Sequence, residues 1–285
     1  MNRKLYKTKF DSRAIVIHTP EDFEGMRRAG HLSASCLDMI TDYVDIGVST
    51  ERLDDLIAQY FGDHGAISAT LGYRGYPKNS CISLNEVVCH GIPSPDTILK
   101  ERDVLNIDVT CILDGWYGDT SRMYIAGQRQ GGKTSGTRKK LIDVTYDCLM
   151  DAIAMIKPGV HLGDLGASIV KKARANRFSV VEDFVGHGIG QEFHMAPNVM
   201  HYGRKGEGVE LREGMIFTVE PMINVGVKES DIDDNDGWTA RTLDRKTSAQ
   251  FEHTVGVTAQ GVEIFTLSPK GYTKPPYENK SSSQG

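Results

Sequence analysis

Acidic side chains that stand inside apolar, strand-like runs are the residues in this chain best suited to do chemistry. The segment DVLNIDVTCILDGWYGDTSRMYIAG contains two of them, Asp108 and Asp119. Between two strand-like runs, Asp114 and Gly115 are typical of the two-residue loop of a β-hairpin. With that loop, Asp119 lies opposite Thr110, which shares a face of the sheet with Asp108 because strand side chains alternate. Two carboxylates this close would repel unless a counter-charge, such as a pair of divalent cations, lay between them.

The second half of the chain contains further residues of the same kind. Glu220 directly follows the apolar run MIFTV, and Glu252 stands in the strand-like run AQFEHTVGV. His187 lies in GHGIG, where small neighbours leave its imidazole unobstructed. Four carboxylates and one histidine form an oxygen-rich set that favours a pair of Co, Mn, Fe or Zn ions over a structural zinc held by thiolates. Taken singly, each residue is more often a solvated or structural group, so the hypothesis depends on all five.

Helices must support the strands that carry these residues. The sequence TPED (19–22) predicts a helix start, with a capping hydroxyl, a proline in the first turn and an acid three residues on. Apolar residues at helical spacing then predict helices over 20–44 and over about 50–61. The same pattern returns over about 141–156 and from 162 onward, where a Lys-Pro-Gly stop separates the two segments.

The second half repeats the first at a constant offset of 112 positions. VLNID (104–108) falls on IFTVE (216–220), which places Glu220 at the position of Asp108, and Leu53 falls on Leu165. A constant offset indicates two related halves, each built from two helices followed by strands. Chance matching among common helix and strand patterns is the alternative.

Composition limits the classes of protein that fit. The chain has 285 residues and a formal net charge of −5, from 33 Lys and Arg against 38 Asp and Glu. This balance argues against a protein that mainly coats nucleic acid or an anionic membrane, so we expect no DNA and no membrane partner. Five cysteines without a CxxC pair fit reduced thiols in a cytoplasmic protein. The chain also contains no apolar stretch of the roughly 18 residues that a membrane-spanning helix needs.

The domain organisation follows from the repeat and from the polar ends. We expect a single catalytic domain over 20–267, with halves of about 20–130 and 131–267. Residues 1–19 read as a polar, basic N-terminal arm that ends in an edge strand over 14–17. Residues 268–285 are rich in Pro, Lys, Ser and Tyr without a period, which predicts a flexible C-terminal tail.

At these motifs the sequence resembles the type I methionine aminopeptidases in their short bacterial form, metallopeptidases with the duplicated "pita-bread" fold. The matching stretches, in family order, are CISLNEVVCHGIP, NIDVT, YGDTSRM, GHGIG, FTVEPM and SAQFEHT. The resemblance implies an α+β fold of two pseudo-symmetric halves, in which antiparallel sheet is backed by helices. It also implies removal of the initiator methionine from nascent chains whose second residue is small, by attack of a metal-bound hydroxide on the scissile carbonyl.

The resemblance further implies how the five residues would hold two divalent metal ions. Asp108 would bind one ion, and Asp119 and Glu252 would bridge both. His187 and Glu220 would complete the ligands of the other ion. The identity of the ions, among Co, Mn, Fe and Zn, stays open.

Catalytic and substrate-binding residues are implied in the same way. His90 would contact the substrate amine or the scissile amide, His194 would hydrogen-bond the scissile carbonyl, and Glu220 would carry a proton to the leaving amine. His90 and His194 would also border an apolar slot for the methionine side chain. The other residues implied for this slot are Tyr73, Tyr76, Cys81, Phe193 and Trp238. The segment ESDIDDNDGW (229–238), which ends in Trp238, is more acidic and longer than the usual loop of the family.

Further partners are implied less directly. Asn85, Val87 and Ser248 match positions where the family can hold a monovalent cation. The expected substrates are peptides and nascent chains with an N-terminal methionine, and we expect a monomer. The basic runs over 138–140 and 171–174 could make transient contact with a ribosome, although solvated helix faces are the more usual meaning of such runs.

Two other functions remain as alternatives. A proline-directed aminopeptidase or prolidase has a similar set of five ligands, but such relatives place a sizeable domain before the catalytic one. A non-catalytic binding protein of this fold usually lacks some of the ligands, and this chain has all five.

Overall fold

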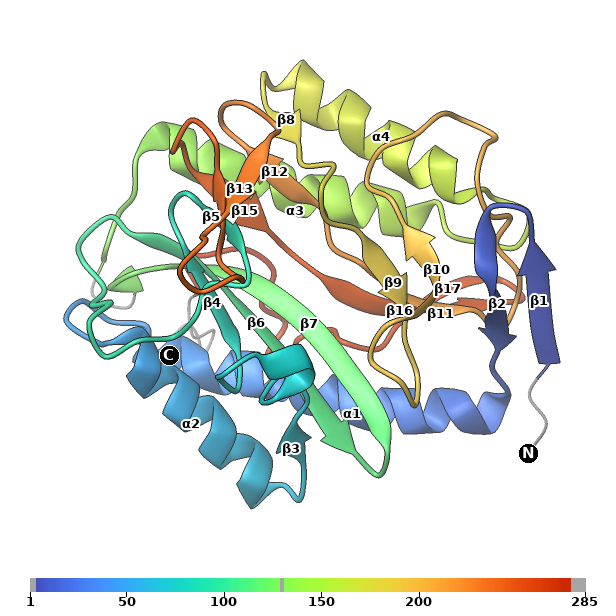
Figure 1. The fold of residues 1–285 in the computed structure, drawn as a ribbon, viewed down its shortest axis with the longest axis horizontal. Coiled ribbons are helices and arrows are strands. Elements are labelled where there is room, and N and C mark those ends of the chain that lie inside the picture. Colours follow the sequence, from blue (N-terminus) through green and yellow to red (C-terminus); the bar gives the residue numbers. More distant parts are fainter. Residues whose placement is uncertain (1–3, 129–130, 278–285) are drawn as a thin grey trace, which may run out of the picture.

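Two pairs of helices enclose a set of antiparallel strands in the structure, a computed structural model that describes residues 4–128 and 131–277 (Figure 1). In Figure 1 the first pair lies along one edge of the strands and the second pair along the opposite edge. The four helices are α1 (Pro20–Ile40), α2 (Thr50–Asp63), α3 (Gly136–Ala154) and α4 (Leu162–Ala175).

The predicted start of α1 is confirmed, and its predicted end is several residues too late. Thr19 accepts a hydrogen bond from the Asp22 amide, and the Asp22 carboxylate accepts one from the Thr19 amide, which completes a capping box. The α-helix stops at Ile40 and continues as a 3₁₀ turn over Thr41–Tyr43. There the Thr41 hydroxyl donates to the Leu37 carbonyl at the end of the helix.

A long hairpin dominates the first half, and its predicted register is confirmed. Asp114 and Gly115 form the loop with φ values of 51° and 78°, and Thr110 lies opposite Asp119. The strands of this half are β3 (Ile67–Ser68), β4 (Cys81–Leu84), β5 (Val87–Cys89), β6 (Val104–Leu113) and β7 (Trp116–Ile125). Strand β6 lies between β7 and the edge strands β3 and β4.

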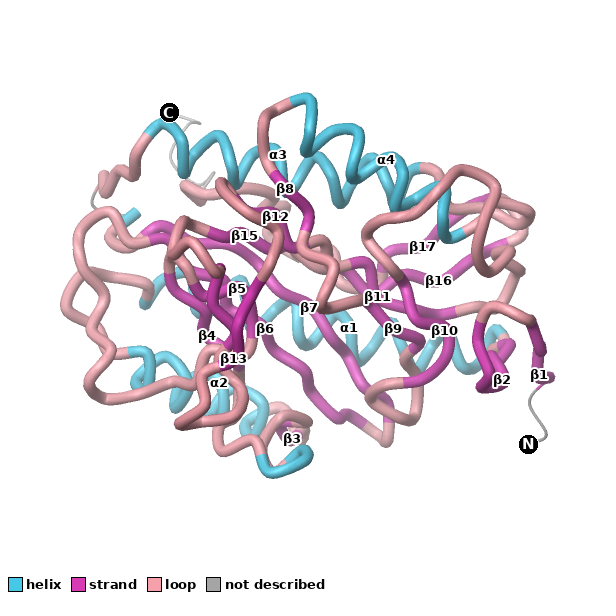
Figure 2. The backbone as a smooth tube through the Cα atoms, turned by 45° about the horizontal axis from the view of Figure 1, so that its top comes forward, coloured by secondary structure: helices cyan, strands magenta, loops and turns pink. Residues whose placement is uncertain are grey.

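Shorter strands build the second half. A five-stranded sheet has the order β10-β9-β11-β16-β17 (Figure 2), and β12 pairs with both β8 and β15. The pairing of β14 with β5 joins the two halves. The strands are β8 (Ser179–Val180), β9 (Gly186–Gly188), β10 (Met195–Val199), β11 (Ile216–Val219), β12 (Met222–Asn224), β13 (Ser230–Ile232), β14 (Ala240–Thr242), β15 (Ser248–Gln250), β16 (His253–Thr258) and β17 (Gly261–Ile264).

The predicted repeat is visible in the positions of the elements. Helices α2 and α4 begin and end 112 positions apart, and so do the short strands β3 and β8. Each half has its own apolar core between helices and strands, but the cores interlock. Val104 and Met123 of the first half are buried with the second core, whereas Ile216 and Phe265 of the second half are buried with the first.

Both ends of the described chain pack onto the halves. Residues 4–17 form a hairpin of β1 (Lys4–Thr8) and β2 (Asp11–Ile17), and its Ile15 is only 1% exposed within the second core. At the other end, Ser268 and Lys270 donate hydrogen bonds to the Asp38 carboxylate. The Tyr277 hydroxyl donates to a backbone carbonyl of β7. Residues 268–277 of the expected flexible tail are therefore packed, because Asp38 is buried and needs these donors; 278–285 lie outside the described residues.

None of the helices within residues 4–128 and 131–277 combines the length and the apolar character that crossing a lipid bilayer requires.

Helix α1 approaches β7 very closely at Gly118, next to Asp119. A Cβ atom at Gly118 would lie 2.2 Å from the Ala29 carbonyl oxygen of α1. The Ser33 hydroxyl donates to the Gly118 carbonyl, and the Cys111 thiol donates to the Ala29 carbonyl. Because Gly118 has no side chain, α1 can pack directly against β7. This contact holds the neighbouring Asp119 in position.

We predict that Gly118→Ala lowers the free energy of unfolding by about 1–3 kcal/mol, because the added methyl meets helix backbone. Urea-induced unfolding followed by circular dichroism measures this change. Gly62→Ala is the matched control: Gly62 lies in α2, where a Cβ atom would meet nothing within 4 Å, and alanine there is expected to stabilise by up to about 1 kcal/mol. A Gly118→Ala protein as stable as the parent would disprove the tight contact.

Candidate metal centre

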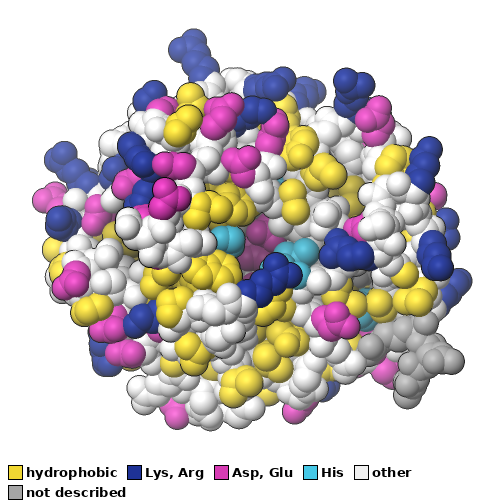
Figure 3. All heavy atoms as spheres, viewed as in Figure 1, with side chains coloured by type: hydrophobic (Ala, Val, Ile, Leu, Met, Phe, Trp, Pro, Cys, Tyr) yellow, Lys and Arg dark blue, Asp and Glu magenta, His cyan; other side chains and the backbone are white. Residues whose placement is uncertain are grey.

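A cavity of about 350 Å³ is lined by residues from both halves, with histidines at its rim and acidic side chains deeper inside (Figure 3). It brings together every residue that the sequence nominated for divalent metal, catalytic and substrate contacts: Tyr73, Tyr76, Cys81, His90, Asp108, Asp119, His187, Phe193, His194, Glu220, Trp238 and Glu252. Thr110, predicted to face Asp119, also lines the cavity, and sequence reasoning missed the other lining residues: Thr70, Arg74, Asp183, Phe184, Val185 and Met222.

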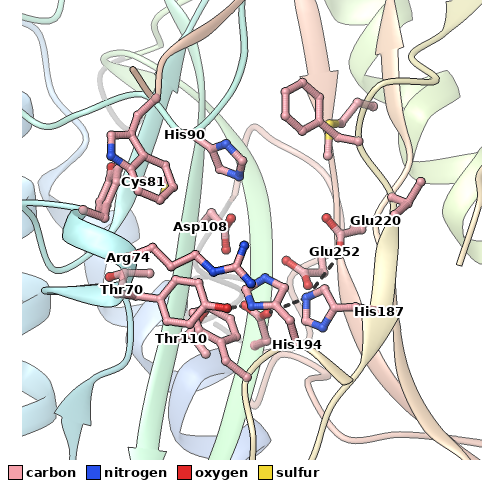
Figure 4. A pocket seen from close by; sticks show the side chains of 18 of the residues that line it. Thr70, Arg74, Cys81, His90, Asp108, Thr110, His187, His194, Glu220 and Glu252 are labelled. Atoms are coloured by element: carbon pink, nitrogen blue, oxygen red, sulfur yellow. Dashed lines mark hydrogen bonds and ion pairs between the residues drawn. The ribbon is translucent and has the colours of Figure 1, made fainter. Parts of the chain in front are cut away.

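Five neighbouring strands place the carboxylates and His187 around one space (Figure 4). Asp108 lies on β6, Asp119 on β7 and His187 on β9, whereas Glu220 directly follows β11 and Glu252 directly precedes β16. One ligand atom from each of Asp119, His187 and Glu252 lies within 4.8 Å of the other two. The Nε2 atom of His187 is 3.5 Å from Asp119 Oδ2 and 3.7 Å from Glu220 Oε1.

Strand register explains why residues so distant in sequence meet. Asp108 pairs with Cys81 across β6 and β4, so the thiol and the carboxylate lie side by side. Val219 pairs with His253 across β11 and β16, which brings the next residues, Glu220 and Glu252, together.

Neutral side chains orient the carboxylates. The Thr110 hydroxyl donates to Asp119 Oδ1 and the Thr218 hydroxyl donates to Glu220 Oε1, both at 2.7 Å. The Gln250 amide donates to the other Glu220 oxygen at 3.3 Å. Such outer contacts fix the direction of a ligating carboxylate without supplying a positive charge.

His201 also supports Glu220, and nothing in the sequence pointed to it. The Glu220 amide donates to His201 Nε2 at 3.0 Å, which requires the tautomer protonated on Nδ1. Burial lowers the pKa of His201 to about 3, so the ring is neutral at pH 7. His201 stands in a polar stretch without apolar periodicity, so the sequence gives no sign of its burial.

The electrostatics of the cavity show an excess of negative charge. Burial and then the neighbouring carboxylates raise the pKa of Asp108 and Glu252 well above the ordinary value. Burial also raises the pKa of Glu220 to about 7, although His187 opposes this shift. Burial alone would lower the pKa of His187, but its contacts with Asp119 and Glu220 outweigh burial and raise it. One imidazole cannot balance four ionised carboxylates, so all four can ionise together only when further positive charge is bound.

The donor set fits divalent metal ions. His187 directs Nδ1 to the Gly188 carbonyl at 3.1 Å, which leaves Nε2 facing the carboxylates as a free ligand atom. Carboxylate oxygens with one imidazole nitrogen suit hard and borderline divalent ions. The nearby thiols of Cys81 and Cys89 are buried, and burial raises the pKa of each.

Aromatic rings form the wall beside this centre. Tyr73 lies 4.9 Å from Phe193 and Tyr76 lies 5.2 Å from Trp238, measured between ring centroids, the second pair edge to face. The acidic segment before Trp238 forms β13 and a turn, in which the Asp236 carboxylate accepts a hydrogen bond from the Trp238 amide at 2.7 Å. This acidic segment therefore holds the indole in the cavity wall.

Two histidines flank the cavity, and both are neutral at pH 7. His90 has a φ of 57°, a left-handed conformation that is uncommon for a residue with a side chain and is often found at functional sites. Burial lowers its pKa. At the opposite rim, partial burial and then the positive charges of His187 and Arg74 lower the pKa of His194. Both rings can therefore act as neutral hydrogen-bond donors.

Comparisons with known proteins agree with this architecture. The model of metallopeptidase family M24 matches residues 24–259. A methionine aminopeptidase from Rickettsia prowazekii is 53% identical over 263 residues, covering 92% of this chain and 99% of that protein. The crystal structure of methionine aminopeptidase from the same organism matches with a TM-score of 0.86 and covers 89% of this chain and all of that one. A prolidase from Pyrococcus horikoshii, 18% identical with a TM-score of 0.69 over 88% of this chain and 63% of that one, shows the fold alone. The predicted α+β fold with two antiparallel halves is confirmed.

We predict that metal-free protein loses stability as the pH rises. A carboxyl with a raised pKa binds its proton more tightly in the folded state, so stability falls as the pH rises from about 4.5 through the folded-state pKa. Glu252→Gln removes one such group. In EDTA at pH 8 it should raise the free energy of unfolding by about 1–3 kcal/mol and flatten the pH profile.

Urea unfolding between pH 5 and pH 8 measures both effects, with the exposed Glu101→Gln as control. Added Mn²⁺ should reverse the order, stabilising the parent more than Glu252→Gln, because the variant lacks a ligand. If Glu252→Gln is no more stable than the parent in EDTA at pH 8, the cluster is not electrostatically strained.

Proposed function

The chain belongs to metallopeptidase family M24 and, within it, to the methionine aminopeptidases, and we propose that it removes the initiator methionine from proteins whose second residue is small. The single observation that carries the proposal is the cavity, in which an oxygen-rich metal donor set adjoins an apolar, aromatic slot. A hydrolase needs the first and a methionine-specific enzyme needs the second.

We assign the metal ligands as Asp108, Asp119, His187, Glu220 and Glu252, holding two divalent ions among Co, Mn, Fe and Zn. The four carboxylate charges equal the charge of two such ions, which supports this number. When bound, the ions supply Lewis acidity at the scissile carbonyl and lower the pKa of a bound water. The threonines at 110 and 218 keep the carboxylates directed toward the same point.

Three residues of the chain would bind the substrate and transfer protons. His194, neutral at pH 7, can donate a hydrogen bond to the scissile carbonyl oxygen as negative charge develops there. His90 can orient the nitrogen of the scissile amide from the opposite rim. Glu220 can accept a proton from the attacking water and deliver it to the leaving nitrogen as the carbon–nitrogen bond breaks.

The aromatic wall accounts for selection of methionine. A thioether packs well on the edges of aromatic rings, and the slot has rings from Tyr73, Tyr76, Phe193 and Trp238 together with the Cys81 thiol. Tyr76 is fixed by hydrogen bonds from its hydroxyl to two backbone carbonyls, at 3.1 and 3.0 Å. A rigid slot of this kind disfavours charged or β-branched first residues.

A monovalent cation near Asn85, Val87 and Ser248 is a further part of the proposal. The Ser248 amide donates to the Asn85 carbonyl at 2.8 Å, which brings these two residues together. The Ser248 hydroxyl oxygen is buried and has no hydrogen-bond partner within residues 4–128 and 131–277. A cation would give that oxygen a partner.

The physiological setting that we propose is a monomeric, cytoplasmic enzyme whose catalytic domain spans 20–267. Its substrates are peptides and nascent chains with an N-terminal methionine, and it has no DNA or membrane partner. Transient contact with a ribosome would use the basic runs over 138–140 and 171–174. Lys139 and Lys172 pair with two acids of α3, Asp143 and Asp151, which favours solvated helix faces instead.

We predict that EDTA-treated protein is inactive and that Co²⁺, Mn²⁺ or Fe²⁺ restores release of methionine from Met-Ala-Ser. With Ala, Val and Leu in turn at the second position, activity should decrease as that side chain grows. Asp108→Ala should lower kcat/KM by at least about 100-fold, because a ligand is lost. Mass spectrometry of the products measures the release.

Asp55→Ala, on the exposed face of α2, is the matched control and should retain full activity. Release of the first residue from Xaa-Pro peptides, with Met-Ala-Ser left intact, would establish the proline-directed alternative. Binding of Met-Ala-Ser without cleavage at any metal load would establish the non-catalytic one.

We further predict that His194→Ala lowers kcat by roughly 10²–10³-fold with little change in KM, because its hydrogen bond strengthens only as the carbonyl oxygen gains charge. Steady-state kinetics on Met-Ala-Ser separate the two constants. His31→Ala removes an exposed imidazole from α1 and serves as control. An equal loss in both variants, or a loss confined to KM, would contradict this role.

A further inference from the structure

Arg74 extends a guanidinium group across the mouth of the cavity. Its side chain is exposed and extends from a short 3₁₀ turn over Tyr73–Gly75. In Figure 4 it lies in front of Asp108 and reaches toward His194. Its carbon Cζ lies 5.4 Å from the centre of the Tyr73 ring. Within residues 4–128 and 131–277, no carboxylate lies within ion-pair distance of Arg74, so its charge has no acidic partner there.

The backbone around Arg74 is held in a defined conformation. Arg74 has a φ of 49°, and the flanking Gly72 and Gly75 have φ values of 81° and 89°. The left-handed conformation costs a non-glycine residue free energy and persists only where its surroundings impose it. Here Tyr76, buried and hydrogen-bonded to two carbonyls, anchors the end of the turn. The turn therefore aims the guanidinium at the mouth of the cavity.

The guanidinium of Arg13 also acts on this rim, but it already has protein partners. Arg13 of β2 donates to Asn198 at 2.7 Å and pairs with Asp11 at 3.1 Å. The charges of both Arg74 and Arg13 act on His194. The rim at His194 is thus positive, and Arg74 is the member of the pair that is available to a ligand.

We propose that Arg74 binds a carboxylate of the substrate beyond the scissile bond, and so favours acidic residues after the small second residue. The inference rests on the proposed function, because it takes His194 to mark the position of the scissile carbonyl. A guanidinium beside that point lies within reach of the third and fourth residues of a peptide. Guanidinium and carboxylate groups match in shape and can form paired hydrogen bonds.

The test compares kcat/KM for methionine release from three amidated peptides that begin Met-Ala-Asp, Met-Ala-Ser and Met-Ala-Lys. We expect the parent to prefer Asp over Lys by about three- to tenfold at low salt, with a smaller preference at roughly 0.5 M NaCl. The preference should disappear in Arg74→Gln, persist in part in Arg74→Lys and reverse in Arg74→Glu.

A free C-terminal carboxylate is the second possible source of the same charge. The free acid Met-Ala-Ser, compared with its amide, measures that source separately. If Arg74→Gln lowers kcat/KM only for the free acid, the guanidinium binds the chain terminus of short peptides, and the proposed preference for acidic side chains is wrong. If Arg74→Gln lowers kcat/KM for the amidated Asp peptide, the proposal stands.

Arg174→Gln is the matched control, because Arg174 is an exposed arginine of α4 outside the cavity lining. It should leave the preference for Asp over Lys unchanged. Equal rates for the Asp and Lys peptides in the parent, or a preference that survives Arg74→Gln, would overturn the proposal. Absence of methionine release from the Ser peptide by the parent would instead refute the proposed function.

Discussion

The collection of four carboxylates in one largely buried space is the constraint on which the rest of this structure depends. Asp119, Glu220 and Glu252 are buried, and Asp108 is half-buried beside them. Their mutual repulsion opposes folding until cations are bound, so the backbone must hold them by other means. Strand pairing does this, because β6 with β7 and β11 with β16 supply one pair of carboxylates each, and the interlocked cores keep the two pairs opposed.

The same constraint explains the buried ion pair behind the sheet. Asp38 of α1 pairs with Arg122 of β7, three residues beyond Asp119. Ser268 and Lys270 add donors to the same carboxylate. A hydrogen-bonded pair of this kind fixes the helix against the strand that carries Asp119, one of the proposed metal ligands, and the C-terminal segment completes it.

Much of this arrangement was predictable because local rules and long-range packing agree. The Asp-Gly turn determines the register of β6 and β7, and hence that Thr110 faces Asp119; the offset of 112 places Glu220 by analogy with Asp108. The packing of residues 268–277 was not predictable, since their polar composition is that of a loose tail and their partner Asp38 is distant in sequence. The roles of His201 and Arg74 were not predicted for a similar reason, because each depends on contacts with an element that is distant in the sequence.

Charge balance links the floor of the cavity to its rim. Without metal, the raised pKa values keep protons on several of these carboxyl groups, and no described carboxylate is paired with Arg74. With two divalent ions bound, as proposed, the four negative charges are balanced and the floor no longer attracts a guanidinium. The conformation of the turn and the Tyr73 ring then keep Arg74 at the mouth, where a carboxylate of the substrate can reach it. The metal-bound carboxylates would thus serve the scissile bond, whereas Arg74 at the mouth would serve the part of the peptide beyond that bond.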